Sequence, residues 1–454
     1  MATVGSTALR ARFAVVLSEL YGREVPAYRT LVEVAHQVNA DVVARSGESA
    51  ERLGSLDRVT AERHGAIRVG TPAELAQVAR VFAAMGMHPT GYYDLRDASA
   101  SSVPVVSTAF RPLEADELAA NPFRVFTSVL ATSDRRFFSA DLSTRLQAFL
   151  SRRRLFADEL LELADRAVAE GGLSEEDAQT FLTLAAGSFA LSAEPIDRTW
   201  YRELEQVSAV AADIGGVGST HINHLTPRVL DIDALYAAMS ARGIAMIDAI
   251  QGPPRWAGPD VLLRQTSFRA LAEPRQFREA DGSVSEGSLR VRFGEVEARG
   301  VALTRAGRAR YDEAVAAVDA AAGSGGDDAA AVWAGFFPAT EAGLYAEGLG
   351  VCTVTAVPDR AGVGAPEGST AELLRDGWLR ADPVVYEDFL PRSAAGIFVS
   401  NLSEAGSKDT DVAGADLDAE WLEGVLARPL HDPFDLYEAQ HQASLSTARR
   451  RLGL

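Results

Sequence analysis

The chain has 454 residues, of which 47% are hydrophobic and 24% are charged, and its formal net charge is −19. This length exceeds one ordinary domain, and the composition is that of a soluble globular protein. The negative charge argues against broad nucleic-acid binding, which needs Lys and Arg to neutralise phosphates, so no nucleic-acid partner is expected.

The single cysteine, Cys352, excludes an intrachain disulfide and a thiolate cluster, so a bound metal would need His and carboxylate ligands. The segment from Met1 to Ala14 lacks a basic stretch followed by an apolar one, and no apolar run reaches membrane-spanning length. These features predict a cytoplasmic protein without a membrane partner, and they leave its oligomeric state unknown.

The N-terminal part of the chain predicts two helices followed by mixed structure. Amphipathic spacing over 8–22 and 26–43 indicates helices, separated by Gly22 and Pro26. The run 64–69 is typical of a strand, and 72–82 is typical of a helix that Thr71 would cap. A β-like run follows at 103–110.

Residues 114–213 are predicted to be predominantly helical, forming a large helical insertion. Helical spacing recurs in four stretches: 142–151, 156–169, 175–189 and 201–212. Ser174, with Asp177 three residues later, has the form of a capping box at the third of them.

The second half of the chain begins like the first, with a His-bearing strand and then a helix at 231–239. Further elements are expected as β-like runs at 262–267, 287–293 and 296–303, a late core strand at 389–402 and a C-terminal helix at 437–451. We therefore expect an α+β protein with a division between 1–213 and 214–454.

A His followed four residues later by an Arg occurs twice, as His64 with Arg68 and as His224 with Arg228. A single His is usually a surface or core residue, but here both begin matching strand–helix units. Two His and one carboxylate form the facial triad that holds non-haem Fe(II) and leaves positions open for substrate and O2. His221 competes with His224, and only the repeat alignment, with its Arg at the same offset, favours His224.

The carboxylate of the predicted triad would come from the run 293–300, which contains Glu295 and Glu297. Two residues apart on a strand, they share one face. One could bind metal while the other is solvated or paired with Arg299, and periodicity does not separate them. The alternative is a charged, exposed strand face.

Arg68 and Arg228 each share the strand face of their His, which would place a guanidinium near the metal. A bidentate clamp on a substrate carboxylate is the natural use of such a group, with weak surface ion pairs as the alternative. Arg68 is the stronger candidate, because Pro227 would distort the strand before Arg228.

Four segments together resemble the 2-oxoadipate dioxygenase/decarboxylase family of the vicinal oxygen chelate superfamily. The resemblance covers most of the chain and is carried by 63–68, 221–228, 293–300 and 398–401. The most specific of these is the string His-Ile-Asn-His-Leu-Thr-Pro-Arg at 221–228.

The resemblance implies two βαβββ modules that form a cupped mixed sheet around the metal. It implies that Glu295, with Arg299 four residues later, is the metal ligand and that Glu297 is not. It further implies that Arg68 contacts the substrate and that Val399 and Ser400 line its binding site.

The family likeness also implies an Fe(II)-dependent enzyme of lysine degradation, with a 2-oxo acid and O2 as small-molecule partners. It would convert 2-oxoadipate to 2-hydroxyglutarate and CO2, incorporating both oxygen atoms of O2. The alternatives are a metal-dependent isomerase, lyase or ring-cleaving dioxygenase on the same fold, or a non-catalytic ligand-binding protein. Nucleotide-binding, P-loop and serine-hydrolase motifs are absent from the sequence.

Overall fold

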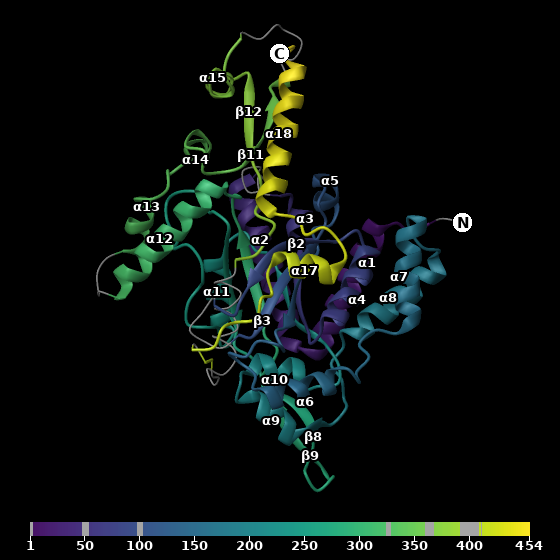
Figure 1. The fold of residues 1–454 in the computed structure, drawn as a ribbon. Coiled ribbons are helices and arrows are strands. Elements are labelled where there is room, and N and C mark those ends of the chain that lie inside the picture. Colours follow the sequence, from purple (N-terminus) through teal and green to yellow (C-terminus); the bar gives the residue numbers. More distant parts are fainter. Residues whose placement is uncertain are drawn as a thin grey trace.

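A computed structural model describes residues 3–47, 54–97, 103–323, 328–358, 367–390, 408–409 and 411–454. The fold is a mixed α+β arrangement with several open sheets and many helices (Figure 1). No helix among the described residues is long and apolar enough to cross a membrane.

The central sheet has five strands in the order β2-β3-β4-β1-β6. Their bounds are β1 Arg63–Val69, β2 His88–Asp94, β3 Val105–Arg111, β4 Arg124–Leu130 and β6 Ile222–Pro227. β1 is parallel to β4 and antiparallel to β6, so the first strand of the second half completes a sheet of the first half.

Helices cover one face of this sheet and build the largest apolar core (Figure 1). The helices of the first part are α1 Ser6–Glu24, α2 Pro26–Ser46, α3 Leu56–Ala61, α4 Pro72–Ala83 and α5 Ala115–Ala120. The predicted helices at 8–22, 26–43 and 72–82 are confirmed. Ile67 and Val69 of β1 point into this core, which leaves His64, Ala66 and Arg68 for the opposite face.

The prediction of a predominantly helical segment from 114 to 213 is wrong at β4, which lies inside that segment and at the centre of the sheet. The segment also holds the short strand β5 Ile196–Asp197. Its helices are α6 Ala140–Leu150, α7 Asp158–Glu170, α8 Glu175–Ser188, α9 Arg198–Glu205 and α10 Ala209–Gly215. The single helix predicted at 201–212 is therefore two, because Ser208 caps a new one.

The second half adds α11 Ile232–Ala241 and two further sheets. β7 Leu263–Phe268 pairs antiparallel with β10 Gly294–Arg299, while β8 Glu273–Arg278 and β9 Val284–Leu289 form a hairpin beside β5. β10 also lies beside β6, because the Val229 amide donates to the Glu297 carbonyl at 2.8 Å. The strands β1, β6 and β10 are thus consecutive neighbours.

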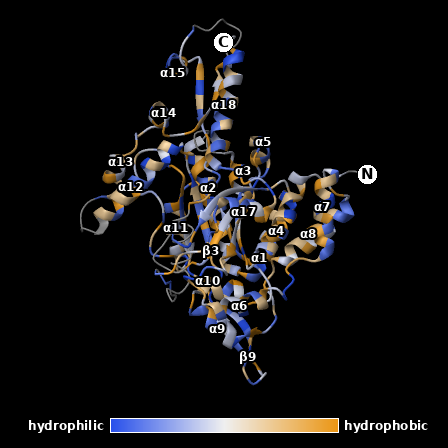
Figure 2. Ribbon diagram, viewed as in Figure 1, coloured by the Kyte–Doolittle hydropathy of each residue, from blue (hydrophilic) through white to orange (hydrophobic). Residues whose placement is uncertain are grey.

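The C-terminal part contains an arm that projects from the body of the molecule (Figure 1). The arm consists of β11 Cys352–Ala356, β12 Leu379–Pro383, α15 Thr370–Arg375 and the long α18 Pro433–Arg451, packed around a small apolar cluster of their own. The far end of α18, with Arg449, Arg450 and Arg451, is hydrophilic (Figure 2). The remaining helices are α12 Arg305–Gly323, α13 Ala329–Ala334, α14 Glu341–Ala346 and α17 Ala419–Leu426.

Candidate metal centre

Three neighbouring strands bring together the residues that the sequence pattern singled out. His64 comes from β1, His224 from β6 and Glu295 from β10. In the register of β1 and β6, His224 lies opposite Ala66, next but one to His64. One ligand atom of each of the three side chains lies within 4.8 Å of the others, close enough to share one metal ion.

The donor atoms of the cluster face one another. His64 Nε2 is 3.6 Å from Glu295 Oε1, and His224 Nε2 is 3.4 Å from Glu295 Oε2. The three residues are 2%, 5% and 4% exposed, so water does not compensate the carboxylate charge. Two imidazoles and one carboxylate on one side of a shared point make a donor set that suits a divalent transition metal.

Electrostatics in the cluster favour a cation at its centre. Burial, and after it the Glu297 carboxylate, raises the pKa of Glu295 well above its ordinary value. Burial also lowers the pKa of His64 and of His224, the latter far below its ordinary value, so both imidazoles are neutral donors. A metal ion here would supply the charge that Glu295 needs to ionise.

Glu297 has a different environment from Glu295, although both project from the same face of β10. Its Oε1 lies 3.1 Å from His64 Nδ1 and 2.6 Å from Arg299 Nε. Burial opposes ionisation, but the charges of Arg299 and Arg124 and the hydrogen bond with His64 outweigh it and lower the pKa of Glu297 to about 2. An ionised Glu297 favours a proton on His64 Nδ1, which leaves the lone pair of Nε2 for a metal.

Arg228, the second Arg of the repeat, is paired with a carboxylate inside the protein. Its Nη1 donates to Glu62 Oε2 at 2.9 Å, and Glu62 also accepts from Arg124 at 2.7 Å. These pairs belong to a buried ion network behind the cluster, formed by Arg58, Glu62, Arg124, Arg228, Glu297, Arg299 and Glu387. Inside it four guanidinium groups are paired with three carboxylates, and such pairing is what allows charges to be buried.

Arg68 lies on the cluster side of β1 and is 4% exposed. Its guanidinium donates to the carboxylate of Asp213 on α10, and its backbone carbonyl accepts from Thr220 Oγ1 at 2.7 Å. After burial and His64, the charge of Arg68 helps to lower the pKa of His224, so Arg68 is electrostatically close to the candidate ligands.

His221, the competitor of His224, lies beside Asp213 and away from the cluster. Its Nε2 is 3.4 Å from Asp213 Oδ1 and 3.1 Å from Asn223 Nδ2, which itself donates to Asp213 Oδ2 at 3.1 Å. Burial lowers the pKa of His221 to about 4 against the opposing charge of Asp213, so the ring is neutral. His221, Asn223 and Asp213 therefore form the support behind Arg68.

Two aromatic rings that the sequence patterns did not single out pack against the candidate ligands. The Phe389 ring meets His64 edge to face at 5.0 Å, and the Phe293 ring lies 5.2 Å from His224. Phe293 begins the segment 293–300 that carries the family resemblance, but neither residue was assigned a functional role from the sequence. Val399 and Ser400, the predicted substrate-contacting residues, and the motif at 398–401 lie outside the described residues.

Comparisons with known proteins agree over nearly the whole chain. A family model described as 2-oxoadipate dioxygenase/decarboxylase matches residues 13–401. A Mycobacterium tuberculosis protein with that name is 59% identical over 434 residues, which is 96% of each chain. A Pseudomonas putida protein with the same name is 40% identical over 466 residues, covering 99% of this chain and 98% of that one.

Solved structures give the same relationship. The crystal structure of the hydroxyglutarate synthase from Pseudomonas putida in complex with 2-oxoadipate matches with a TM-score of 0.85 at 37% identity, covering 100% of both chains. A putative glyoxalase superfamily protein from Ralstonia eutropha matches with a TM-score of 0.50 at 21% identity, covering 65% of this chain and 84% of that one. The second likeness concerns the fold alone.

Proposed function

The chain belongs to the 2-oxoadipate dioxygenase/decarboxylase family and is an enzyme, and we propose that it converts 2-oxoadipate and O2 to 2-hydroxyglutarate and CO2. The observation that carries the proposal is a buried cluster of two His and one Glu in a chain that matches the family almost end to end. We assign Fe(II) to this cluster, with His64, His224 and Glu295 as its ligands.

The proposed reaction balances without a further reductant. The carboxylate next to the keto group leaves as CO2, one oxygen atom of O2 enters the new carboxylate at the former keto carbon, and the other enters the hydroxyl group. Fe(II), when bound, supplies the O2-binding site and the redox chemistry. The near-full-length similarity does not favour a redox-neutral isomerase or lyase, or a non-catalytic binding protein.

The residues of the chain would position the substrate and the metal ligands. Arg68 would hold a substrate carboxylate, because a buried guanidinium offers a fixed fork of donors to such a group. Asp213 would fix the orientation of the Arg68 guanidinium, and Glu297 would fix the orientation of the His64 ring. The rings of Phe293 and Phe389 would keep bulk water from the reacting groups. The substrate contacts of Val399 and Ser400 stay predictions.

We also infer that the fold contains two βαβββ units of the vicinal oxygen chelate kind. The first would be β1-α4-β2-β3-β4, whose strands lie in the order β2-β3-β4-β1. In the second, β6 and α11 precede a segment that bridges to β7 at Met246 and Gln251, followed by β7 and β10. The helices α6 to α10 and the hairpin β8–β9 would then be insertions, and the proposed domains remain 1–213 and 214–454.

Oxygen uptake tests the proposed reaction. Apoprotein would be loaded anaerobically with Fe(II), then given 2-oxoadipate and air, and we expect equal amounts of O2 consumed and of CO2 and 2-hydroxyglutarate formed. His64→Ala should lose both iron and turnover, whereas His221→Ala should keep its iron because His221 faces Asp213. Absence of uptake by iron-loaded protein would contradict the assigned substrate.

Substrate anchoring is tested separately with Arg68. Arg68→Ala should raise KM for 2-oxoadipate by about 10- to 100-fold, since a hydrogen bond to a charged group contributes roughly 1.5–3 kcal/mol. Asp213→Asn keeps the guanidinium but weakens its support, so KM should rise less. Steady-state O2 uptake gives both values, and an unchanged KM in Arg68→Ala would remove Arg68 from the substrate site.

A further inference from the structure

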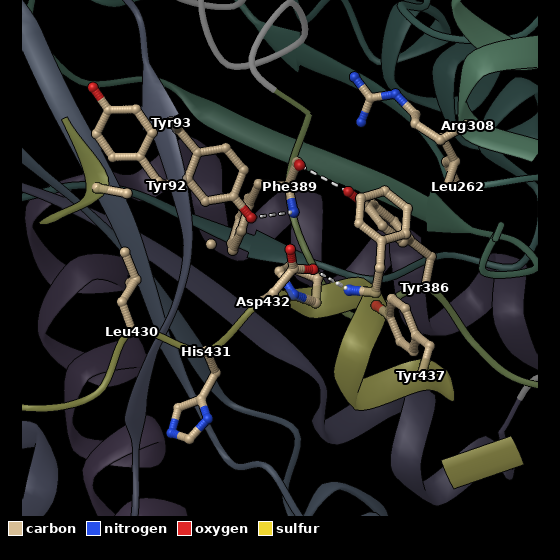
Figure 3. Close-up of a pocket in the computed structure, with 14 residues that line it drawn as sticks. Tyr92, Tyr93, Leu262, Arg308, Tyr386, Phe389, Leu430, His431, Asp432 and Tyr437 are labelled. Carbon is tan, nitrogen blue, oxygen red and sulfur yellow. Dashed lines mark hydrogen bonds between the residues drawn. The ribbon is translucent and has the colours of Figure 1, made fainter. Parts of the chain in front are cut away.

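Phe389 borders both the candidate metal centre and a separate cavity of about 420 Å³. The cavity is lined mainly by aromatic and apolar side chains, among them Tyr92, Tyr93, Tyr386, Leu430, Phe434 and Phe389 itself (Figure 3). His64 is not among its lining residues, although the Phe389 ring packs on it at 5.0 Å. The Phe389 ring therefore separates the cavity from the candidate ligand His64.

The structure holds Phe389 firmly in this position. Its backbone amide donates to Tyr93 Oη at 3.4 Å, and its carbonyl accepts from Tyr386 Oη at 2.7 Å (Figure 3). Its ring also contacts the Phe126 ring at 5.0 Å, and the Arg299 guanidinium lies 5.7 Å from its centre. With its backbone fixed on both sides and its ring packed, Phe389 acts as a wall.

The wall stands beside the path that the substrate would take. A molecule bound at the metal and held by Arg68 would run along β1 from His64 past Ala66. Phe126 lies directly opposite Ala66 in the parallel pairing of β1 with β4. Because Phe389 packs on both His64 and Phe126, it limits the width of this path on the β4 side.

We propose that Phe389 is a specificity-determining residue that restricts the enzyme to narrow, unbranched 2-oxo acids by closing off the aromatic cavity. This inference rests on the proposed function, because it places the substrate between the metal and Arg68. Removal of the ring joins the cavity to the substrate space, and its lining then accommodates a bulky apolar side chain.

The test compares 2-oxoadipate with phenylpyruvate, a 2-oxo acid that carries an aromatic ring, in wild type and Phe389→Ala. We expect the ratio of kcat/KM for phenylpyruvate to that for 2-oxoadipate to rise by about tenfold or more. Changes of this size are typical when a pocket is enlarged to admit a bulkier apolar group. Calorimetric titration of anaerobic, Fe(II)-loaded protein should show the same shift in relative affinity. Phe389→Leu, which keeps an apolar side chain, should shift the ratio in the same direction by less.

Leu430→Ala is the matched control, because Leu430 lines the same cavity without an aromatic contact to His64. It enlarges the cavity but leaves the wall in place, so the ratio should stay at the wild-type value. An equal change for both substrates in Phe389→Ala and Phe389→Leu, or the same shift in Leu430→Ala, overturns the proposal. Wild-type protein that consumes no O2 with 2-oxoadipate contradicts the proposed function instead, and the relative affinities still decide the role of Phe389.

Discussion

Glu295 and Glu297 show how two identical side chains on one strand face acquire different chemistry. Glu295 lies between two neutral imidazoles and has a raised pKa, whereas Glu297 is paired with Arg299 and stays ionised. Periodicity alone could not separate them, because the difference also depends on groups of other strands, such as His64 of β1 and Arg124 of β4. The structure is consistent with the ligand choice that the family resemblance implied, and that choice remains a prediction.

Glu297→Gln should weaken metal binding by about 10- to 100-fold, as changes to groups that orient a ligand generally do. The reason is that His64 Nδ1 would face a neutral amide in place of a carboxylate. The measurement is the affinity of apoprotein for Fe(II) under anaerobic conditions, or for Zn²⁺, by calorimetry.

Glu387→Gln is the matched control for this substitution. It removes the same charge from the same buried network, where Glu387 contacts Arg58 and Arg124 but makes no ion pair with His64. We expect lower thermal stability with unchanged metal affinity. Equal losses of affinity in both variants would mean that the network acts on the site only through general stability.

At the residue scale, local order along the chain was enough to select the two His that the structure brings together, and their role as ligands stays a prediction. His64 and His224 were selected by a repeated pattern, and the structure brings both to Glu295. The same pattern did not predict the partner of Arg228, because an equal offset along two strands does not give equal neighbours, and Arg228 pairs with Glu62, just before β1. No sequence pattern indicated a role for Phe389, because its proposed role depends on the groups that pack against both sides of its ring.

At the scale of elements, the unit formed by β1 and α4 is the one that the sequence predicted most fully. Thr71 accepts from the Glu74 amide at 3.1 Å, and Glu74 accepts from the Thr71 amide at 3.1 Å, which completes a capping box before a buried helix face. β4 was missed although Val125, Phe126, Thr127 and Val129 favour a strand. The helical spacing of the neighbouring stretches outweighed this strand signal in the prediction for 114–213.

Thr71→Ala should lower the free energy of unfolding by about 1 kcal/mol, because α4 loses its cap while its apolar face belongs to the main core. The measurement is the shift of the main transition in thermal or urea unfolding. Ser369→Ala removes an equivalent capping box from α15, which packs in the separate cluster of the arm.

We expect the Ser369→Ala variant to exchange amide hydrogens faster in α15 with little change in the main transition, because local opening suffices there. If Ser369→Ala moved the main transition as much as Thr71→Ala, the arm and the body would unfold as one cooperative unit.

At the scale of the whole molecule, the chain returns from its C-terminal part to the edge of the first sheet. The His431 carbonyl accepts from the Gly91 amide at 2.8 Å, and the His431 amide donates to the Pro89 carbonyl at 3.0 Å. The rings of His88 and His431 then meet edge to face at 6.1 Å. This contact between distant parts of the chain could not be predicted from local patterns.

The His88–His431 contact should make stability depend on pH. Burial lowers the pKa of both rings, helped by His431 and Arg428 at His88 and by Arg111 at His431. Below about pH 6.5 the unfolded chain therefore binds more protons than the folded chain does. The stability that is present above that pH is lost as the pH falls. We expect the thermal midpoint to fall on acidification below this value.

In His88→Gln/His431→Gln the same acidification should lower the midpoint less steeply, since two of the groups that resist protonation are gone. The buried rings of His64, His221 and His224 keep part of the slope, because burial lowers their pKa as well. Parallel pH profiles for the variant and wild type would show that the pair does not contribute.

The pairing of β1 with β6 has a consequence for a chain cut in two. Ala193 and Glu194 are exposed in the connection between α8 and β5, so a nick there would place His64 on one polypeptide and His224 with Glu295 on the other. The ladder between β1 and β6 and the shared core would still join the fragments. Neither fragment holds a full set of donors, so separately expressed halves should regain tight metal binding only on reassociation, which makes the site a reporter of complementation.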